Sequence, residues 1–323
     1  MNRTARHRST ALLAAASVLA LAGCSTSGAA ATDEDAPAAA SAETVSVEHA
    51  QGTTDVPVDP EDVITFDLGV LDSLRALGED VQGLPRSGSL PQQFAEYASD
   101  DYVNAGSMKE PDLEAVAEAA PDLIIISGRT ADFYDELAEI APTVDLSLDQ
   151  TDALNSFTEQ SETLGRIFGK ETEVEERLTA VDEQIEETKA RTAGAGSAMF
   201  LLTSAGEVNA YGPDSRFGNI VFDLLGFESA ADVQAEGTHG EAVSFEAISA
   251  ADPDHLFVLD RDTAIGQSGG EAARQVLDNE LVDGTTAAQQ DRITYVDSAS
   301  WYLVGFGLDN LPAMIDEVQE SLS

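Results

Sequence analysis

The sequence is poor in cysteine and in basic residues. Cys24 is the only cysteine among 323 residues, so the chain cannot form a disulfide within itself. Lys and Arg number 16 against 60 Asp and Glu, which gives a formal net charge of −44. So negative a surface argues against binding to nucleic acid or to an anionic lipid surface. The few cations are therefore informative, because a cluster of them would form an anion site.

The sequence also lacks a hydrophobic run long enough to span a membrane in the mature protein. Its one apolar run, residues 11–22, follows three arginines and leads into LAGC, which ends at Cys24. This arrangement resembles a bacterial lipoprotein signal, in which residues 1–23 are removed and Cys24 is lipidated, with palmitate among the acyl groups. Residues 24–44 are small and acidic and predict a flexible tether. We therefore expect a body anchored by lipid to the outer face of the cytoplasmic membrane, with no thiol left for chemistry.

A catalytic constellation is missing as well. No activated serine is evident, because neither Ser244 nor Ser300 has an evident His or acid partner in the sequence. Of the four histidines, His7 leaves with the signal, while His49 and His255 lie in predicted strands, which disfavours a zinc or manganese site. We therefore expect a protein that is not an enzyme and has no intrinsic cofactor.

The chain contains an internal repeat, in which one segment occurs twice. Glu114–Arg129 reads EAVAEAAPDLIIISGR and Glu246–Arg261 reads EAISAADPDHLFVLDR, with Pro seven residues and Arg fifteen residues after the Glu in both. Each copy predicts a short helix, a Pro-Asp turn, a buried strand and an Arg just past the strand. Because ligands of open α/β sheets bind beyond the carboxyl ends of strands, Arg129 and Arg261 are expected to face one ligand site. The alternative is that both are ordinary surface cations at strand ends.

A long amphipathic helix separates the two copies. In Glu171–Thr192, apolar residues recur at spacings of 4, 3 and 4 with acids between them. At 1.5 Å per residue this helix is about 30 Å long, which makes it a rigid strut. We therefore expect an α/β fold with two similar lobes, residues 45–168 and 194–323, joined by one bridging helix within 169–193, and a ligand cleft between the lobes. Residues 52–57 are expected to form a turn.

Further loops carry residues that suit the same ligand site. Arg216 lies in YGPDSRFG at a predicted helix start, where a cation is unfavourable for the helix and is thus a candidate for a ligand. His239 lies between glycines in GTHG, and Tyr302 lies in SWY. Together with Arg129 and Arg261, Arg216 suits a multiply anionic, oxygen-rich ligand, because guanidinium groups stay charged and donate in forks. Imidazole and phenolate are donors that ferric iron accepts.

In this order, the segments LAGC, PDLIIISGR, YGPDSRFG, GTHG, PDHLFVLDR and SWYLVGFG resemble the siderophore-binding lipoproteins of ABC importers, particularly those for catecholates. The resemblance spans nearly the whole mature chain and implies a monomer of two α/β lobes bridged by one long helix. It implies that the three arginines hold a ferric catecholate. It also implies that His239 and Tyr302 complete the iron's coordination when the siderophore supplies only four donor oxygens. Glu114 and Glu246 are the implied docking residues for the ABC permease.

Other functions stay open at this point. A haem-binding lipoprotein could use a His and a Tyr as axial ligands, although two propionates would need fewer than three arginines. A surface siderophore hydrolase would need a nucleophile that the sequence does not offer, and a purely structural lipoprotein would leave the repeated arginines unexplained. Glu114 and Glu246 could also be first-turn glutamates favoured by the helix dipole.

Overall fold

The computed structural model describes residues 43–322 except 87, 89, 234–239 and 268–271. Ala42–Ser323 forms one compact unit. The predicted signal, the lipidation site Cys24, most of the tether and His239 lie outside the described residues. Within the described ranges, no helix is both long and apolar enough to cross a membrane.

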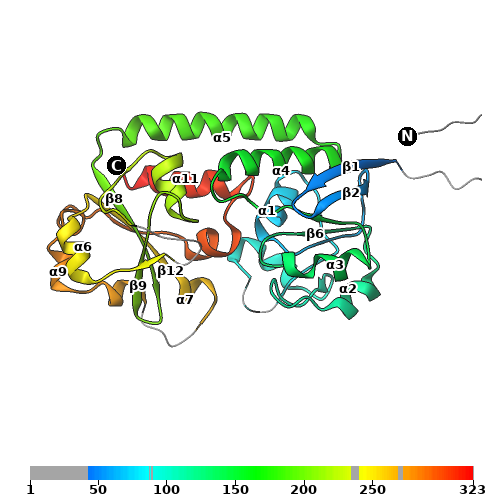
Figure 1. Cartoon of the computed structure of the whole chain (residues 1–323), viewed down its shortest axis with the longest axis horizontal. Coiled ribbons are helices and arrows are strands. Elements are labelled where there is room, and N and C mark those ends of the chain that lie inside the picture. Colours follow the sequence, from blue (N-terminus) through cyan, green and yellow to red (C-terminus); the bar gives the residue numbers. More distant parts are fainter. Residues whose placement is uncertain (1–42, 87, 89, 234–239, 268–271, 323) are drawn as a thin grey trace, which may run out of the picture. The chain divides into compact units, whose positions relative to one another are not determined.

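The N-terminal lobe is built on a five-stranded parallel sheet (Figure 1). The strand order is β5-β4-β3-β6-β7, with β3 Val63–Thr65, β4 Gly83–Leu84, β5 Val103–Asn104, β6 Leu123–Ile126 and β7 Thr143–Asp145. The central strands are continuous apolar runs because helices cover both faces of a parallel sheet. The helices of this lobe are α1 Leu68–Ala76, η1 Gln92–Ala98, α2 Leu113–Ala119, η2 Ala131–Phe133 and α3 Tyr134–Ala138.

Residues 52–57 form a strand, so the prediction of a turn there was wrong. β1 (Thr44–His49) and β2 (Gly52–Pro57) form an antiparallel hairpin. The Thr54 hydroxyl donates to the Thr143 carbonyl at 3.0 Å, and Val56 is fully buried. The Gly, Asp and Pro content suggested a turn, but burial against β7 and pairing with β1 stabilise an extended strand, as tertiary context often does.

The C-terminal lobe is built on a mixed sheet of six strands. The order is β11-β9-β8-β12-β13, with β10 paired to the start of β8. The strands are β8 Ser197–Ser204, β9 Glu207–Tyr211, β10 Glu228–Ser229, β11 Glu241–Ala242, β12 His255–Asp260 and β13 Ile293–Tyr295. Its helices are η3 Ile220–Leu224, α6 Phe245–Ala251, α7 Arg261–Ala264, α8 Ala273–Val276, α9 Glu280–Asp283, α10 Thr286–Gln289, η4 Ser300–Val304 and α11 Asn310–Glu320. Strands β8-β12-β13 are parallel, as β3-β6-β7 are in the other lobe.

The repeated segment folds the same way in both lobes. Helix α2 is capped at its start by the Asp112 side chain, and α6 by the Ser244 side chain. Both helices end on a left-handed residue, and both then continue into a strand that pairs in parallel on each side. The Asp after each Pro accepts a backbone N–H at the start of the neighbouring strand: Asp122 from Asp62, and Asp254 from Ser197.

Two helices connect the lobes along one side (Figure 1). α4 (Ala153–Phe168) ends at Gly169, and the 22-residue α5 (Glu171–Thr192) packs against both α4 and α11. Near its start, Arg177 of α5 donates to the Ala76 carbonyl at 2.6 Å in the N-terminal lobe. At its end, the Thr192 hydroxyl donates to the Leu225 carbonyl at 2.6 Å in the C-terminal lobe. The long helix therefore contacts both lobes, as the expected strut does.

The chain returns to the N-terminal lobe just before α11. The Asp72 carboxylate of α1 accepts the backbone N–H groups of Asp309 and Asn310 at 2.9 and 2.8 Å. Burial raises the pKa of Asp72, and these two hydrogen bonds oppose that shift. A carboxylate of one lobe thus caps a helix of the other, because the first N–H groups of α11 have no partner within the helix.

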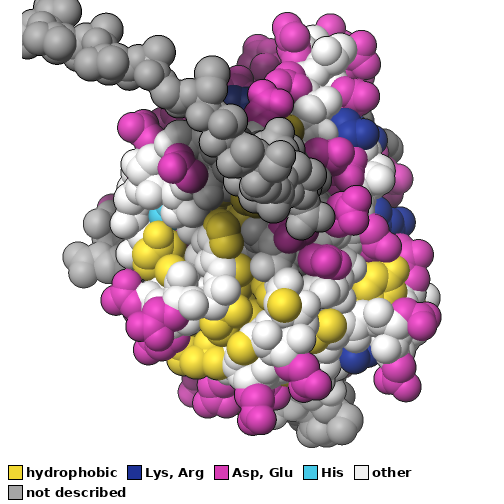
Figure 2. Space-filling model, turned by 90° about the vertical axis from the view of Figure 1, so that its right-hand side faces the viewer, with side chains coloured by type: hydrophobic (Ala, Val, Ile, Leu, Met, Phe, Trp, Pro, Cys, Tyr) yellow, Lys and Arg dark blue, Asp and Glu magenta, His cyan; other side chains and the backbone are white. Residues whose placement is uncertain are grey.

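The surface is as acidic as the composition predicts. Figure 2 shows Asp and Glu side chains spread over the N-terminal-lobe face, with few Lys or Arg among them. A group of cations without carboxylate partners is therefore exceptional in this molecule.

Candidate functional site

Four of the predicted site residues meet between the lobes. Arg129 follows β6 in the N-terminal lobe, and Arg261 is the first residue of α7 directly after β12. Arg216 lies in the turn that precedes η3, and Tyr302 lies in the π-helical segment η4. We call these four residues the arginine–tyrosine cluster.

The backbone of Tyr302 is the point where the two lobes converge. Its carbonyl accepts from Arg129 Nη2 at 2.7 Å and from Arg216 Nη2 at 2.6 Å. Arg129 Nη1 also lies 3.4 Å from the Leu303 carbonyl. One carbonyl oxygen, with two lone pairs, therefore accepts from guanidinium groups that come from opposite lobes.

The side chain of Tyr302 contacts all three cations. The centre of its ring lies 5.8 Å from Cζ of Arg129, 5.2 Å from Cζ of Arg216 and 5.6 Å from Cζ of Arg261. Its hydroxyl oxygen accepts from Arg261 Nε at 2.9 Å. Guanidinium groups within about 6 Å of an aromatic face are attracted by its quadrupole. The ring thus helps to hold together three positive charges that repel one another.

The positive charge of the cluster is poorly neutralised by the protein. Among the described residues, no carboxylate oxygen lies within 4.0 Å of Arg129 or Arg216, and Arg261 has only Asp262 at 3.9 Å. Asp67 attracts Arg216, but its carboxylate already caps α1 by accepting from Gly69 and Val70. Burial, and then repulsion from Arg129, lower the pKa of Arg216 to about 10, so it stays charged at neutral pH. An anion bound here would offset the repulsion and raise the pKa of Arg216 again.

A buried aromatic layer supports the cluster from below. The Arg216 guanidinium lies 4.8 Å from the centre of the Phe217 ring, and Phe217 stacks on Phe200 at 5.6 Å. Trp301 contacts the same Phe200 ring at 5.4 Å, and its indole N–H donates to Glu317 Oε2 at 2.7 Å. These contacts fix the segment that carries Tyr302, so the single tryptophan lies one residue from the cluster.

Two residues at the site were not predicted from the sequence. Met108 packs against Arg129, with its sulfur 3.4 Å from Nη1, and Tyr211 lies 5.0 Å from Phe217 between ring centres. The pKa of Tyr211 is raised to about 12 by burial, while Arg216 and Arg261 oppose that rise. Met108 lies outside every segment that the sequence analysis singled out, whereas Tyr211 begins YGPDSRFG, in which only Arg216 was proposed as a site residue.

Glu114 and Glu246 lie at equivalent exposed positions of the two repeated segments. Each is in the first turn of its helix, two residues after the capping residue. Neither makes an ion pair or a hydrogen bond with any residue that the structure describes. The structure thus places the predicted docking pair on the surface and leaves their roles as predictions, as it does for the arginine–tyrosine cluster and for His239, which lies outside the described residues.

The fold and the cluster together define the class of protein. The chain belongs to the periplasmic binding protein family, whose model it matches over residues 63–299. It is 40% identical over 285 residues to the petrobactin-binding protein YclQ of Bacillus subtilis (strain 168), a match that covers 87% of this chain and 89% of that protein. The crystal structure of YclQ aligns with a TM-score of 0.83 over 87% of this chain and 99% of that one.

Two further relatives are similar over most of the chain. The periplasmic catecholate-siderophore binding protein VctP of Vibrio cholerae is 33% identical, with a TM-score of 0.81 over 86% of this chain and 100% of that one. The ferric-anguibactin-binding protein FatB of Vibrio anguillarum is 28% identical over 278 residues, 84% of this chain and 85% of that protein. The family inferred from the sequence and its two-lobed α/β fold are thus confirmed.

Proposed function

We propose that this protein captures a ferric siderophore of the catecholate type and delivers it to an ABC permease. The observation that carries the proposal is the arginine–tyrosine cluster, in which three guanidinium groups converge with almost no carboxylate compensation inside a strongly acidic protein. A ferric catecholate is a compact anion rich in oxygen acceptors, which suits forked, permanently charged donors. The names of YclQ and VctP support the same class of ligand.

We further propose that Tyr302 and His239 bind the iron when the siderophore supplies only four donors. The Tyr302 oxygen accepts one hydrogen bond from Arg261, which leaves a lone pair for a metal. Gly240, the residue after His239, packs on Tyr211, since a Cβ built on Gly240 would lie 2.7 Å from that ring. Tyr211 in turn borders the cluster. Gly240, the neighbour of His239 in the sequence, thus lies close to a residue that borders the cluster, which supports the proposed role of His239.

The same proposal extends to anchoring and docking. Lipid on Cys24 would hold the mature chain at the outer face of the cytoplasmic membrane, and two B. subtilis relatives are named as lipoproteins. Glu114 and Glu246 are exposed and unpaired among the described residues, so both are available to permease cations. In this role the protein is a monomeric binding protein that catalyses no reaction.

The proposal is tested by titrating residues 44–323 with a ferric tetradentate catecholate, a ferric hexadentate catecholate and haemin. Emission from Trp301 and the visible spectrum report binding. Saturable quenching by the catecholates is expected, and Arg216→Gln should weaken it at least about tenfold, because a hydrogen bond to a charged group is lost. Arg274→Gln is the matched control, since Arg274 stacks on Tyr295 at 3.9 Å. A Soret band with haemin and no response to catecholates would instead identify a haem-binding protein.

Iron ligation has its own test. The double variant His239→Ala, Tyr302→Phe should bind the tetradentate complex about tenfold or more weakly and the hexadentate complex nearly as well as before, because only the first leaves coordination positions open. The charge-transfer band of the tetradentate complex should shift at the same time. Equal losses for both ligands would contradict ligation and leave only a packing role for the pair.

A further inference from the structure

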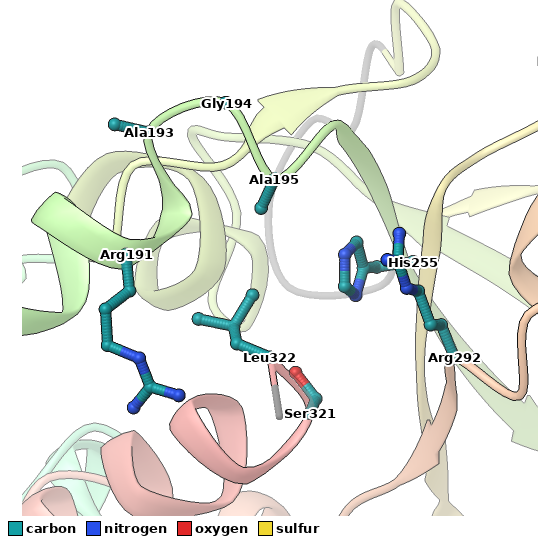
Figure 3. Close-up of a pocket in the computed structure, with 8 residues that line it drawn as sticks. All are labelled: Arg191, Ala193, Gly194, Ala195, His255, Arg292, Ser321 and Leu322. Carbon is teal, nitrogen blue, oxygen red and sulfur yellow. The ribbon is translucent and has the colours of Figure 1, made fainter.

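A second polar pocket lies in the C-terminal lobe, apart from the arginine–tyrosine cluster (Figure 3). Its volume is about 410 Å³. His255, which lines it, is the first residue of β12, whereas Arg261 follows the last residue of that strand. The six residues of β12 span about 20 Å at 3.3 Å per residue, so the pocket and the cluster are at opposite ends of the sheet. Its lining is Arg191, Ala193–Ala195, His255, Arg292, Ser321 and Leu322.

His255 is the unusual member of this pocket. Its side chain is buried, with 2% exposure, yet neither ring nitrogen makes a hydrogen bond of good geometry with a described residue, and only the Ala195 backbone acts on the ring as an acceptor. The ring is held by Phe227 at 5.2 Å and by Phe257 at 6.4 Å between ring centres, and in Figure 3 it faces the pocket. A buried imidazole normally finds a partner, because leaving its polar atoms unpaired is unfavourable. We therefore expect a molecule bound in the pocket to supply the missing hydrogen-bond partner.

The charged groups around His255 are mainly positive. Figure 3 shows Arg292 beside the ring, and the Arg292 guanidinium makes no ion pair or hydrogen bond with any described residue. Arg191, across the pocket, uses Nη2 to donate to the Gln319 carbonyl at 2.8 Å. Asp254, the acid whose charge acts on His255, already accepts from Ser197 N at 2.8 Å.

The electrostatics of the ring agree with this picture. Burial, and then the charge of Arg292, lower the pKa of His255, while the Ala195 backbone and Asp254 oppose that shift only in part. The ring is therefore neutral at neutral pH and offers one N–H donor, whereas the protonated ring would offer two. A bound anion would favour the protonated form.

We propose that this pocket is a binding site for a small doubly charged oxyanion, held by His255 and Arg292 with Arg191 on the opposite wall. Two guanidinium groups and an unpartnered imidazole provide donors and charge for sulfate-like, phosphate-like or dicarboxylate groups, and the pocket has the size of a small-molecule site. The site is independent of siderophore binding, so the two can succeed or fail separately.

Sulfate is the suitable first probe because it stays doubly charged across the range in which histidine titrates. Residues 44–323 are titrated with sodium sulfate at ionic strength held constant with chloride, and the histidine ring signals are followed by NMR. We expect saturable shifts of the His255 signals and a higher titration midpoint for this ring in sulfate, because the anion stabilises the imidazolium. Inorganic phosphate should compete with sulfate for the same site.

Three variants make the test specific. Arg292→Gln should weaken sulfate binding about tenfold, since it removes a charge-assisted donor. His255→Phe keeps the ring packing, removes both nitrogens and assigns the His255 signals; it should abolish the shifts. Arg274→Gln, outside the pocket, should bind sulfate like the parent chain. Circular dichroism and thermal denaturation serve as the folding control for all three, so the test does not depend on siderophore binding.

Two results would contradict the proposed anion site. The absence of sulfate-dependent shifts at His255, or equal sulfate affinities for the parent and Arg292→Gln, would contradict an anion site built on these two residues. The phosphate of a lipid headgroup is the other source of the same chemistry. Binding to phosphatidylglycerol vesicles that depends on Arg292 and is unaffected by soluble phosphate would overturn the proposal of a soluble ligand.

Discussion

The two copies of the repeated segment share their local structure, including individual hydrogen bonds, up to the residue before the arginine. Both carry a side-chain cap, a left-handed helix end, an Asp that binds the neighbouring strand, and a buried strand. The residue before the arginine differs: it is Gly128 in the first copy and Asp260 in the second. The Asp260 side chain caps α7 by accepting from Thr263 at 3.0 Å, so Arg261 begins a helix. Gly128 has no such side chain, and Arg129 lies in a turn.

The equivalent cations also reach different atoms of one tyrosine. Arg129 reaches the backbone carbonyl of Tyr302 at 2.7 Å, whereas Arg261 reaches the hydroxyl at 2.9 Å and the Ser204 hydroxyl at 3.2 Å. The duplication thus supplies one cation per lobe, and the two cations contact Tyr302 differently.

The largest effect is expected when both cations are removed. Arg129→Gln and Arg261→Gln should each weaken ferric catecholate binding about tenfold or more, and the double variant more than either, because each loses a charge-assisted hydrogen bond of about 1.5–3 kcal/mol. Trp301 quenching gives the affinities. Because both arginines contact Tyr302, their effects are expected to be non-additive.

Comparing the single variants with both ligands shows whether the two arginines have the same role or different roles. Equal single losses for tetradentate and hexadentate ligands would mean that the two cations only supply charge. A larger loss for Arg261→Gln with the tetradentate ligand would assign Arg261 to the Tyr302 oxygen. Wild-type affinity in either single variant would contradict the proposed anion site.

The exposed glutamates at the other end of each copy should affect transport and not ligand binding. Glu114→Lys and Glu246→Lys reverse a charge on one lobe each, so each should reduce ligand-stimulated ATP hydrolysis by the reconstituted permease several-fold, and the pair more strongly, since like charges would then face the permease cations. Ligand affinity, measured with the same Trp301 signal, should be unchanged. Glu183→Lys, on the exposed surface of α5, is the matched control. Unchanged stimulation in both single variants would reduce these residues to helix-dipole partners.

Much of the fold could be predicted from the sequence because the signals are local. The bridging helix is visible in the spacing of Val174, Leu178 and Val181, and its observed bounds are Glu171–Thr192. The hairpin strand β2 could not be predicted, because what favours it is pairing with β1 and contact with β7, and both are tertiary. Similarly, no local sequence pattern predicts that Asp72 caps α11, because that helix lies in the other lobe.

The site residues also differ in whether the sequence could predict them. Arg129 and Arg261 could be proposed because they occupy equivalent positions in the repeated segment. Arg216 could be proposed because a cation is unfavourable at a helix start unless it has another role. Their convergence on the Tyr302 carbonyl could not be foreseen, since it depends on how the two lobes face each other. The same holds for Met108 and Tyr211, whose positions beside the cations are set by packing alone.

A smaller effect should follow from deleting the helix caps. The Asp112 side chain accepts from Ala115 N at 3.0 Å, and the Ser244 hydroxyl accepts from Ala247 N at 3.2 Å. Asp112→Ala and Ser244→Ala should each lower the free energy of unfolding by about 1 kcal/mol, as the loss of such caps typically does. Urea denaturation measures both values. A loss in only one variant would show that the two copies share their geometry and differ in their stability.

The smallest effect should distinguish the copies at their helix ends, where Ala120 has φ = 49° and Asp252 has φ = 43°. Ala has no means of offsetting the left-handed conformation, so Ala120→Gly should stabilise the protein by about 0.5–1 kcal/mol. Asp252 is different because its carboxylate accepts from Thr286 N at 2.7 Å and so caps α10. Asp252→Gly should therefore be neutral or destabilising, since relief of strain is offset by loss of that cap. Thermal denaturation can resolve the opposite signs, and a gain of equal size in both variants would mean that the Asp252 cap contributes nothing.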